Sequence, residues 1–403
     1  MFFYLLRCMK FQRFVVILGR KIQTKTSERS MSTSTKIGYK GNKSSEKFEV
    51  NGAFLKISEQ IKSELEGKTL DEAIEYLVSR VKGKYLFSKR LKTVCLSIGM
   101  MNRAIDNGEA DKMVKMAEAL QARGIELIGN AVAARPQVKA VLIAGPSSSG
   151  KTTFSKKLCM ALEQNGLVAQ CLSLDDYYVD RHLTPLDESG EYDYESLYAI
   201  NIELFQQHLS QLLAGEEVQL PRYDFQTGKS LQSDQRLRLT PQSVLIIEGI
   251  HGLNPQLTGS IPEESLFRIY ISALTVAKND DGTYYATTDN RLIRRMVRDA
   301  QVRNTTASQT LARWPSVRRG EEKWITPFQQ NANVNFCTAF QYELALLKQL
   351  ALPLLNNVPE DDPNYEEAQR LKWICNRFHD IPIDLLPPHS LLREFLGGSA
   401  FEY

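Results

Sequence analysis

The chain has 403 residues, of which 43% are hydrophobic and 24% are charged. A chain of this size and composition can bury a large apolar core, which excludes disordered and collagen-like proteins. The six cysteines include no C-x-x-C pair, which argues against a zinc ribbon or a disulfide framework and favours a reducing compartment. No apolar run reaches the roughly 20 residues of a membrane-spanning helix, so we expect no membrane partner.

Positive charge is concentrated at the N-terminus. Residues 1–45 hold ten Lys or Arg and one acid, Glu28, whereas the rest of the chain holds 40 basic and 46 acidic residues. This mildly acidic body gives no electrostatic reason to expect nucleic-acid binding, which depends on clustered basic charge. Residues 1–45 are predicted to be a basic tail, a presequence or a linker, and the alternative to a presequence is that Met31 is the true start. We therefore expect a cytoplasmic protein, or an organellar one such as a mitochondrial protein if residues 1–30 are a presequence.

Apolar patterning predicts helices first and then alternating strands and helices. From about residue 53 to 134, apolar residues recur every three to four positions, as in helices that pack through one face. After Pro136, four short apolar runs are typical of buried strands, and a helix is predicted between the first two, at 154–166; the runs are 138–145, 168–174, 243–249 and 267–272. Short apolar strands separated by helices indicate a parallel sheet.

We therefore predict an α/β protein with a doubly wound parallel sheet of the P-loop kinase type. A helical N-terminal region is expected at 46–135, the sheet domain at 136–345, and a partly helical C-terminal extension at 346–403.

A glycine- and serine-rich segment follows the first predicted strand. Residues Gly145, Pro146, Ser147, Ser148, Ser149, Gly150, Lys151 and Thr152 match the pattern G-x-x-x-x-G-K-[ST] and precede a predicted helix. Small residues let successive backbone N–H groups point into one concavity, and the helix start adds partial positive charge. We expect ATP phosphates to bind residues 145–153, Thr153 included. Lys151 would reach the β and γ phosphates, and Thr152 would offer a hydroxyl to Mg²⁺.

Glu248 is a second candidate ligand of Mg²⁺. It lies at the carboxyl end of the strand predicted at 243–249, on the sheet edge where doubly wound proteins bind ligands. The alternative is a solvent-facing acid at a strand end. One Glu in place of an Asp-Glu pair disfavours a motor ATPase, and the lack of an N-K-x-D segment disfavours a guanine-nucleotide switch.

Several segments occurring in one order resemble the uridine kinase branch of P-loop kinases, a superfamily that also contains phosphoribulokinases. The resemblance spans roughly 138–345, through GPSSSGKTTF at 145–154, SLDDYY at 173–178, EYDYESLYA at 191–199, LPRYDF at 220–225, IIEGIHGLN at 246–254 and TDNRLIRRMVRD at 288–299. Residues 314–329 and the terminal LLREFLGGSAFEY resemble a subgroup of long members with N- and C-terminal extensions. The resemblance implies that ATP phosphorylates the 5′-hydroxyl of a ribonucleoside, uridine or cytidine first.

The resemblance also implies roles for individual residues. Asp175 would take the proton from the ribose 5′-hydroxyl, with its neighbour Asp176 as the alternative. Residues implied to contact the acceptor are Tyr178, Tyr192, Asp193, Tyr223, Arg291 and Gln309. A cationic lid over ATP is implied for Arg294, Arg295 and Arg298, and a solvated basic helix is the alternative there.

One departure leaves the acceptor open. Family members that read uracil carry a His three positions after the Phe of the Tyr-Asp-Phe segment, and this chain has Gly228 there. A site that loses a hydrogen-bonding group loses discrimination. A phosphoribulokinase-like or other small-metabolite kinase is therefore one alternative, and an ATP-binding switch whose helical region binds a partner is another. The oligomeric state stays open, a homo-oligomer included.

Overall fold

The computed structural model describes residues 97–402, except 260, 275–277, 282–284 and 287. These residues belong to one compact unit, Lys84–Tyr403. The expectations for the basic tail, and for the helical pattern as far as residue 96, lie outside the described residues. Within them, no helix is both long enough and apolar enough to cross a membrane.

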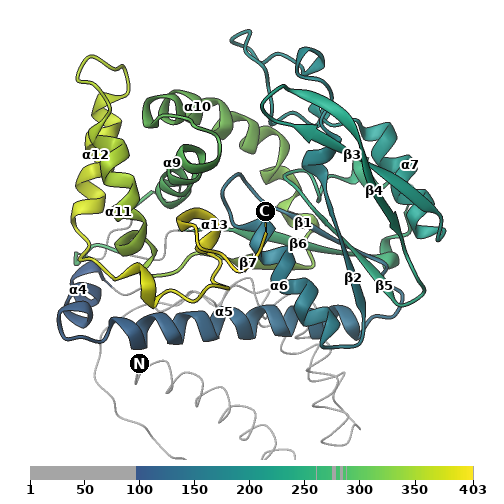
Figure 1. Cartoon of the computed structure of the whole chain (residues 1–403), viewed down its shortest axis with the longest axis horizontal. Coiled ribbons are helices and arrows are strands. Elements are labelled where there is room, and N and C mark those ends of the chain that lie inside the picture. Colours follow the sequence, from purple (N-terminus) through teal and green to yellow (C-terminus); the bar gives the residue numbers. More distant parts are fainter. Residues whose placement is uncertain (1–96, 260, 275–277, 282–284, 287, 403) are drawn as a thin grey trace, which may run out of the picture. The chain divides into compact units, whose positions relative to one another are not determined.

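A five-stranded parallel sheet forms the centre of this unit (Figure 1). Its strands lie in the order β2-β5-β1-β6-β7, with bounds Val168–Ser173, Ser243–Glu248, Ala140–Ala144, Leu266–Ser272 and Val334–Cys337. The chain passes from central β1 to the β2 edge, returns through β5, and then crosses to β6 and β7. This change of direction makes the sheet doubly wound and creates a switch point at the carboxyl end of β1, where such sheets bind ligands.

Both faces of the sheet are covered, because alternate residues of β1 enter two different apolar clusters. Val141 and Ile143 pack with residues of α5 (Ala110–Ala133), α6 (Lys151–Glu163) and α9 (Asp289–Val302). Ala140 and Leu142 pack with residues of α7 (Ile202–Leu213). Burial on both faces explains why β1, β5 and β6 are nearly continuous apolar runs.

The remaining elements surround this core. An antiparallel hairpin, β3 (Glu217–Asp224) and β4 (Lys229–Arg238), lies near α7 at the right of Figure 1. The other α-helices among the described residues are α4 (Ile98–Asp106), α8 (Pro255–Thr258), α10 (Ala307–Trp324), α11 (Glu343–Asn356), α12 (Tyr365–Asn376) and α13 (Arg393–Leu396). The expected domain boundary after residue 345 falls inside α11, and the division at that point stays a prediction.

The predicted doubly wound α/β fold is confirmed. The predicted strands agree with β1, β2, β5 and β6 to within two residues at each end. The predicted helix at 154–166 begins three residues too late, because α6 starts directly at Lys151, after the left-handed Gly150. Strand β7 and the hairpin were not predicted from the sequence.

Candidate functional site

The loop between β1 and α6 has a backbone shape that only small residues allow. Gly145 lies so close to β6 that an added Cβ would stand 2.1 Å from the carbonyl oxygen of Ile271. Gly150, with φ of 81°, precedes the first turn of α6 and has no side chain to cap it. The side-chain oxygens of Ser148 and Ser149 are buried and have no hydrogen-bond partner among the described residues. A helix start whose N-cap residue has no side chain, together with the unpartnered hydroxyls, fits a bound polyphosphate.

A carboxylate and two hydroxyls meet beside this loop. Thr152 Oγ1 lies 3.3 Å from Glu248 Oε1, and Ser173 Oγ lies 3.4 Å from the same oxygen. The parallel register of β2 and β5 places Ser173 directly opposite Glu248. Such oxygen ligands suit Mg²⁺, which takes one or two protein groups together with phosphate oxygens and water. Thr152 and Glu248 are therefore the described residues that would hold the ion.

Glu248 is an acid whose ionisation is opposed by its surroundings. Burial, and next the negative charge of Asp175, raise the pKa of Glu248 to about 7, although Lys151 acts in the opposite direction. A carboxyl whose pKa rises on folding favours the protonated state in the fold. Its stabilising contribution is therefore fully present below pH 4.5 and is lost as pH rises through about 7.

We expect Glu248→Gln to remove the unfavourable burial of a charged carboxylate. The substitution should also weaken Mg²⁺ binding at the magnesium corner, which is formed by Thr152, Ser173 and Glu248. The free energy of unfolding of the variant should exceed that of the wild type at pH 8 by on the order of 1–3 kcal/mol. At pH 4, below the ordinary pKa of the carboxyl, the difference should nearly vanish. Urea unfolding at both pH values measures it, and an equal difference at both would contradict the stated cause.

Asp175 and Asp176 are adjacent but face different neighbours. Both lie in the short 3₁₀ helix Leu174–Tyr177 that follows β2, where the Asp175 N–H donates to Ser173 Oγ. Burial raises the pKa of Asp176, whose carboxylate accepts a hydrogen bond from the backbone of Tyr223 in β3. Asp175 instead acts electrostatically on Glu248 and Tyr178. Of the two acids, Asp175 is the one whose charge acts on Glu248.

Aromatic side chains gather on the β3 side of Asp175. The rings of Tyr178 and Tyr223 lie 5.4 Å apart, and those of Tyr223 and Phe225 lie 5.0 Å apart. Tyr192 is more exposed, and its ring lies 6.0 Å from that of Tyr194 in a tilted arrangement. Asp193 accepts hydrogen bonds from the Glu195 N–H and from the indole N–H of Trp324. The structure thus joins Tyr178 and Tyr223 to one aromatic cluster, whereas Asp193 is engaged with α10.

Two arginines of α9 contact the phosphate loop, and a third, Arg298, pairs with an acid of the same helix. Arg291 donates to the carbonyl oxygen of Ser147 at 3.3 Å, and Arg295 donates to Ser147 Oγ at 2.8 Å. Burial, followed by repulsion from Arg298, lowers the pKa of Arg295 to about 10. Arg298 pairs with Asp299 at 2.7 Å. Arg291 and Arg295 therefore bring positive charge against the phosphate loop.

Two expected positions require correction. Arg294 was expected to form part of a lid over ATP, but its side chain is fully buried in an ion pair with Glu343, at 2.6 Å. Gln309 was expected to contact the acceptor, but its side-chain oxygen accepts from the Thr306 N–H in a capping box at the start of α10. Helical spacing predicts which arginines of α9 share a face. The position of each guanidinium depends on contacts with other elements, which the spacing does not report.

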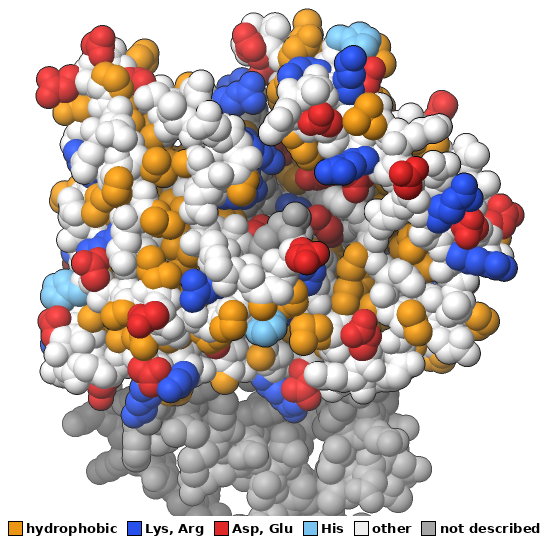
Figure 2. All heavy atoms as spheres, viewed as in Figure 1, with side chains coloured by type: hydrophobic (Ala, Val, Ile, Leu, Met, Phe, Trp, Pro, Cys, Tyr) orange, Lys and Arg blue, Asp and Glu red, His pale blue; other side chains and the backbone are white. Residues whose placement is uncertain are grey.

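A small pocket of about 110 Å³ opens beside the loop, and its lining includes Pro146, Tyr270, Ser272, Arg291, Arg318 and Glu321. Arg291 and Arg318 both donate to the Glu321 carboxylate. Figure 2 shows basic and acidic side chains gathered around a hollow in this face of the molecule.

Two acids at the site, Glu195 and Glu321, were given no role from the sequence. Burial raises the pKa of Glu195, with Arg295 and Lys151 acting against the rise. Its Oε2 is buried and has no partner among the described residues. Gly320 of α10 packs on this side chain, since an added Cβ would lie 2.3 Å from its Cβ. Glu195 and Glu321 lie in segments that carry the family resemblance, but no pattern in those segments gave either acid a role, and only the fold of α10 over the loop brings them together.

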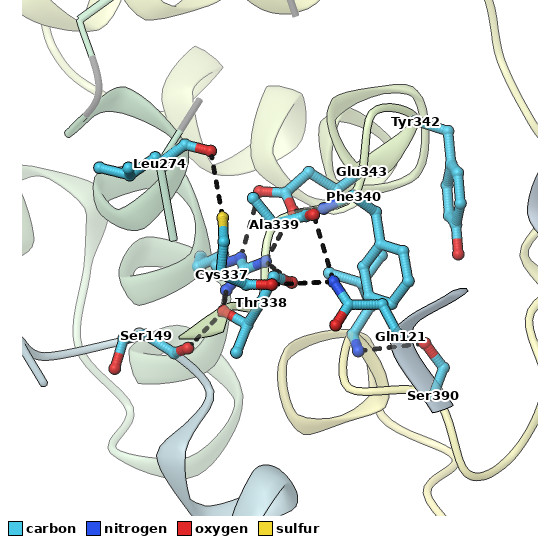
Figure 3. Close-up of polar contacts among 12 residues, drawn as sticks. Gln121, Ser149, Leu274, Cys337, Thr338, Ala339, Phe340, Tyr342, Glu343 and Ser390 are labelled. Atoms are coloured by element: carbon cyan, nitrogen blue, oxygen red, sulfur yellow. Dashed lines mark hydrogen bonds and ion pairs between the residues drawn. The ribbon is translucent and has the colours of Figure 1, made fainter. Parts of the chain in front are cut away.

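Thr338, which follows β7, holds the phosphate loop through a hydrogen bond to its backbone. Thr338 Oγ1 lies 2.5 Å from the Ser149 carbonyl oxygen, as Figure 3 shows. Arg294 donates to the same hydroxyl at 3.2 Å, so the hydroxyl must turn its own proton toward a carbonyl. Glu343 fixes Arg294 and also accepts from the Phe340 N–H. Arg294 is therefore a positioning residue for the loop.

We expect Thr338→Val to raise KM for ATP by about 5–30-fold and to change kcat less, because the Ser149 carbonyl loses its partner. Thr338→Ser should restore wild-type KM. Thr310→Val is the matched control, since the Thr310 hydroxyl is buried without a partner among the described residues. Steady-state kinetics with varied ATP measure the effect, and unchanged KM in Thr338→Val would show that the hydroxyl does not brace the loop.

The chain is similar in sequence to known kinases. The family model described as phosphoribulokinase / uridine kinase matches residues 140–344. The uridine kinase of Ureaplasma urealyticum serovar 10 is 26% identical over 196 residues, covering 48% of this chain and 86% of that protein. The uridine kinase of Staphylococcus aureus strain Newman is 29% identical over 194 residues, covering 48% and 84%. A putative fructose transport system kinase from Silicibacter sp. TM1040 aligns with a TM-score of 0.40 and 21% identity, covering 53% of this chain and 98% of that one.

Proposed function

Since the chain belongs to the phosphoribulokinase / uridine kinase family and is a P-loop phosphotransferase, we propose that it uses Mg-ATP to phosphorylate the 5′-hydroxyl of a ribonucleoside. Uridine and cytidine are the first candidates. The observation that carries the proposal is that the phosphate loop, Glu248 and Asp175 all lie at the carboxyl edge of the sheet, where Thr152 contacts Glu248 and the charge of Asp175 acts on Glu248. Phosphoryl transfer requires positioning, positive charge and one carboxylate for the nucleophile's proton, and this edge offers all three.

The residues divide the work as follows. The backbone N–H groups of residues 147–153 hold the polyphosphate, and Lys151 reaches its outer phosphates. Bound Mg²⁺, held by Thr152 and Glu248, would neutralise charge on the phosphate oxygens. Asp175 accepts the proton of the acceptor hydroxyl while the oxygen of that hydroxyl bonds to the γ-phosphorus. The bond from that phosphorus to the bridging oxygen breaks, and ADP leaves.

The cations of α9 support the same step. Arg291 and Arg295 already contact Ser147 of the loop, and Arg298 lies one turn beyond Arg294 on α9. We assign Arg295 and Arg298 to stabilising charge on the transferring phosphoryl group. Arg291 is assigned to the acceptor, since it also lines the small pocket. Tyr178 and Tyr223 would line the acceptor's base or ring.

One observation favours a different acceptor. Gly228 adopts a φ of 71°, and Arg181 packs over it so closely that an added Cβ would lie 2.6 Å from the guanidinium carbon. Arg181 also donates to the Phe225 carbonyl at 2.7 Å. A cation therefore stands where uracil readers carry a His. A phosphorylated or otherwise anionic small metabolite is the second candidate acceptor, as in a phosphoribulokinase-like kinase.

An acceptor panel tests the proposal and separates these candidates. The full chain is incubated with Mg-ATP and a mixture of ribonucleosides and sugar phosphates, and the products are identified by mass. We expect a nucleoside monophosphate with the new phosphate on the 5′-oxygen. A phosphorylated sugar phosphate without any nucleotide product would favour the second candidate. Nucleotide binding with no acceptor phosphorylated would contradict both and favour a switch.

A further inference from the structure

An acid from the C-terminal extension contacts the start of the phosphate-loop helix. Glu394 Oε2 lies 3.1 Å from the backbone N of Thr153 and 2.7 Å from its Oγ1. Thr153 is the third residue of α6, and its N–H is one of the donors that a helix start leaves without an intrahelical partner. Gly150 cannot cap this turn. Glu394 therefore acts as a remote cap, from α13.

The donors held by Glu394 are the kind that a phosphate loop offers to its ligand. Backbone N–H groups at the end of such a loop cradle the α- and β-phosphates. An N–H has one proton and cannot donate a full-strength bond to two anions at once. Glu394 also adds negative charge to the magnesium corner, where it helps to raise the pKa of Glu248. A carboxylate and an incoming phosphate thus compete for Thr153.

The rest of the extension fixes where Glu394 stands. Phe395 is fully buried, and its carbonyl accepts from Gln301 of α9 at 2.9 Å. The Arg393 guanidinium donates to the carbonyls of Ile383 and Leu386. Lys157 of α6 donates to the His389 carbonyl at 3.0 Å. Glu394 itself is only half-buried, so its side chain can rotate away while the segment stays docked.

From this geometry we propose that the C-terminal extension completes the nucleotide site, with Glu394 as a binding-site residue that occupies the Thr153 donors until a nucleotide phosphate displaces it. The proposal rests on the proposed function, because it assumes that a nucleotide binds residues 145–153. The apparent affinity for ATP is the intrinsic affinity multiplied by the fraction of molecules whose Thr153 donors are free, so occupancy by Glu394 raises the concentration of ATP that the protein needs. This gives the terminal segment a role in nucleotide binding.

The test measures Mg-ATP binding by isothermal titration to the full-length wild type, Glu394→Gln, Glu394→Ala and Asp384→Asn. Both Glu394 variants should bind about 5–30-fold more tightly than the wild type. Asp384 is an exposed acid of the same extension, and its neutralisation should leave affinity unchanged. Without nucleotide, Glu394→Ala should melt at a lower temperature than the wild type, because α6 loses its cap. Saturating Mg-ATP should raise the melting temperature of Glu394→Ala by more than it raises that of the wild type.

The outcomes separate the two proposals. Equal or weaker binding by Glu394→Gln than by the wild type overturns the competition and leaves Glu394 a structural cap. Tighter binding by Asp384→Asn as well would assign the gain to overall charge and also overturn it. If neither the wild type nor any variant binds Mg-ATP, the proposed function fails instead.

Discussion

Asp175→Asn is expected to lower kcat by roughly 10²–10⁴-fold while Mg-ATP still binds, because the amide cannot accept the proton of the acceptor hydroxyl. Asn keeps the size of Asp and the bond from its N–H to Ser173. The loop, Lys151 and Glu248 would therefore keep their places. Single-turnover transfer to the identified acceptor, together with nucleotide titration, measures both effects.

Asp176→Asn is the matched control for this prediction. Its carboxylate accepts from the backbone of Tyr223, so the substitution should weaken the attachment of the 3₁₀ helix to β3 and cost some stability. Turnover per folded molecule should change little. Loss of turnover in Asp176→Asn with full activity in Asp175→Asn would exchange the roles of the two acids. Full activity in both variants would remove the carboxylate base from the mechanism.

Lys151→Met is expected to produce the second large effect, a fall in kcat of roughly 10²–10³-fold with weakened ATP binding. Lys151 Nζ lies 3.3 Å from the Pro146 carbonyl oxygen, across the mouth of the loop. Methionine fills a similar volume, so the loop should keep its shape while the charge is lost. Lys112→Met, on the exposed side of α5, is the control and should be unchanged. Activity in Lys151→Met close to that of the wild type would mean that this cation does not meet the transferring phosphate.

Local chemistry explains what could be predicted from the sequence. The loop at 145–152 was predictable because each of its residues meets a local demand, such as the left-handed φ of Gly150 and the close approach of Gly145 to β6. Buried parallel strands are continuous apolar runs, so β1, β5 and β6 were found to within two residues at each end. The hairpin strand β4 was missed because its exposed residues carry little apolar signal.

Contacts between distant residues explain what could not be predicted. Arg294 belongs to an arginine-rich helix, but Glu343 and Thr338, more than 40 residues away, determine that it faces the interior. Thr153 and Glu394 are separated by 241 positions, and no pattern in either segment points to the other. Such partners are chosen by the packing of α9, α11 and α13 against the sheet. A single sequence carries no periodicity that reports them.

The most direct test of the account is a crystal structure of the full chain with Mg²⁺ and a non-hydrolysable ATP analogue. We predict that its phosphates lie on residues 145–153, with Glu394 displaced from Thr153. The Asp175 carboxylate should face the terminal phosphate across a gap that admits a hydroxyl roughly 3–3.5 Å from the phosphorus. An Asp175 turned away from that phosphate, with no space between them for an acceptor, would contradict the account.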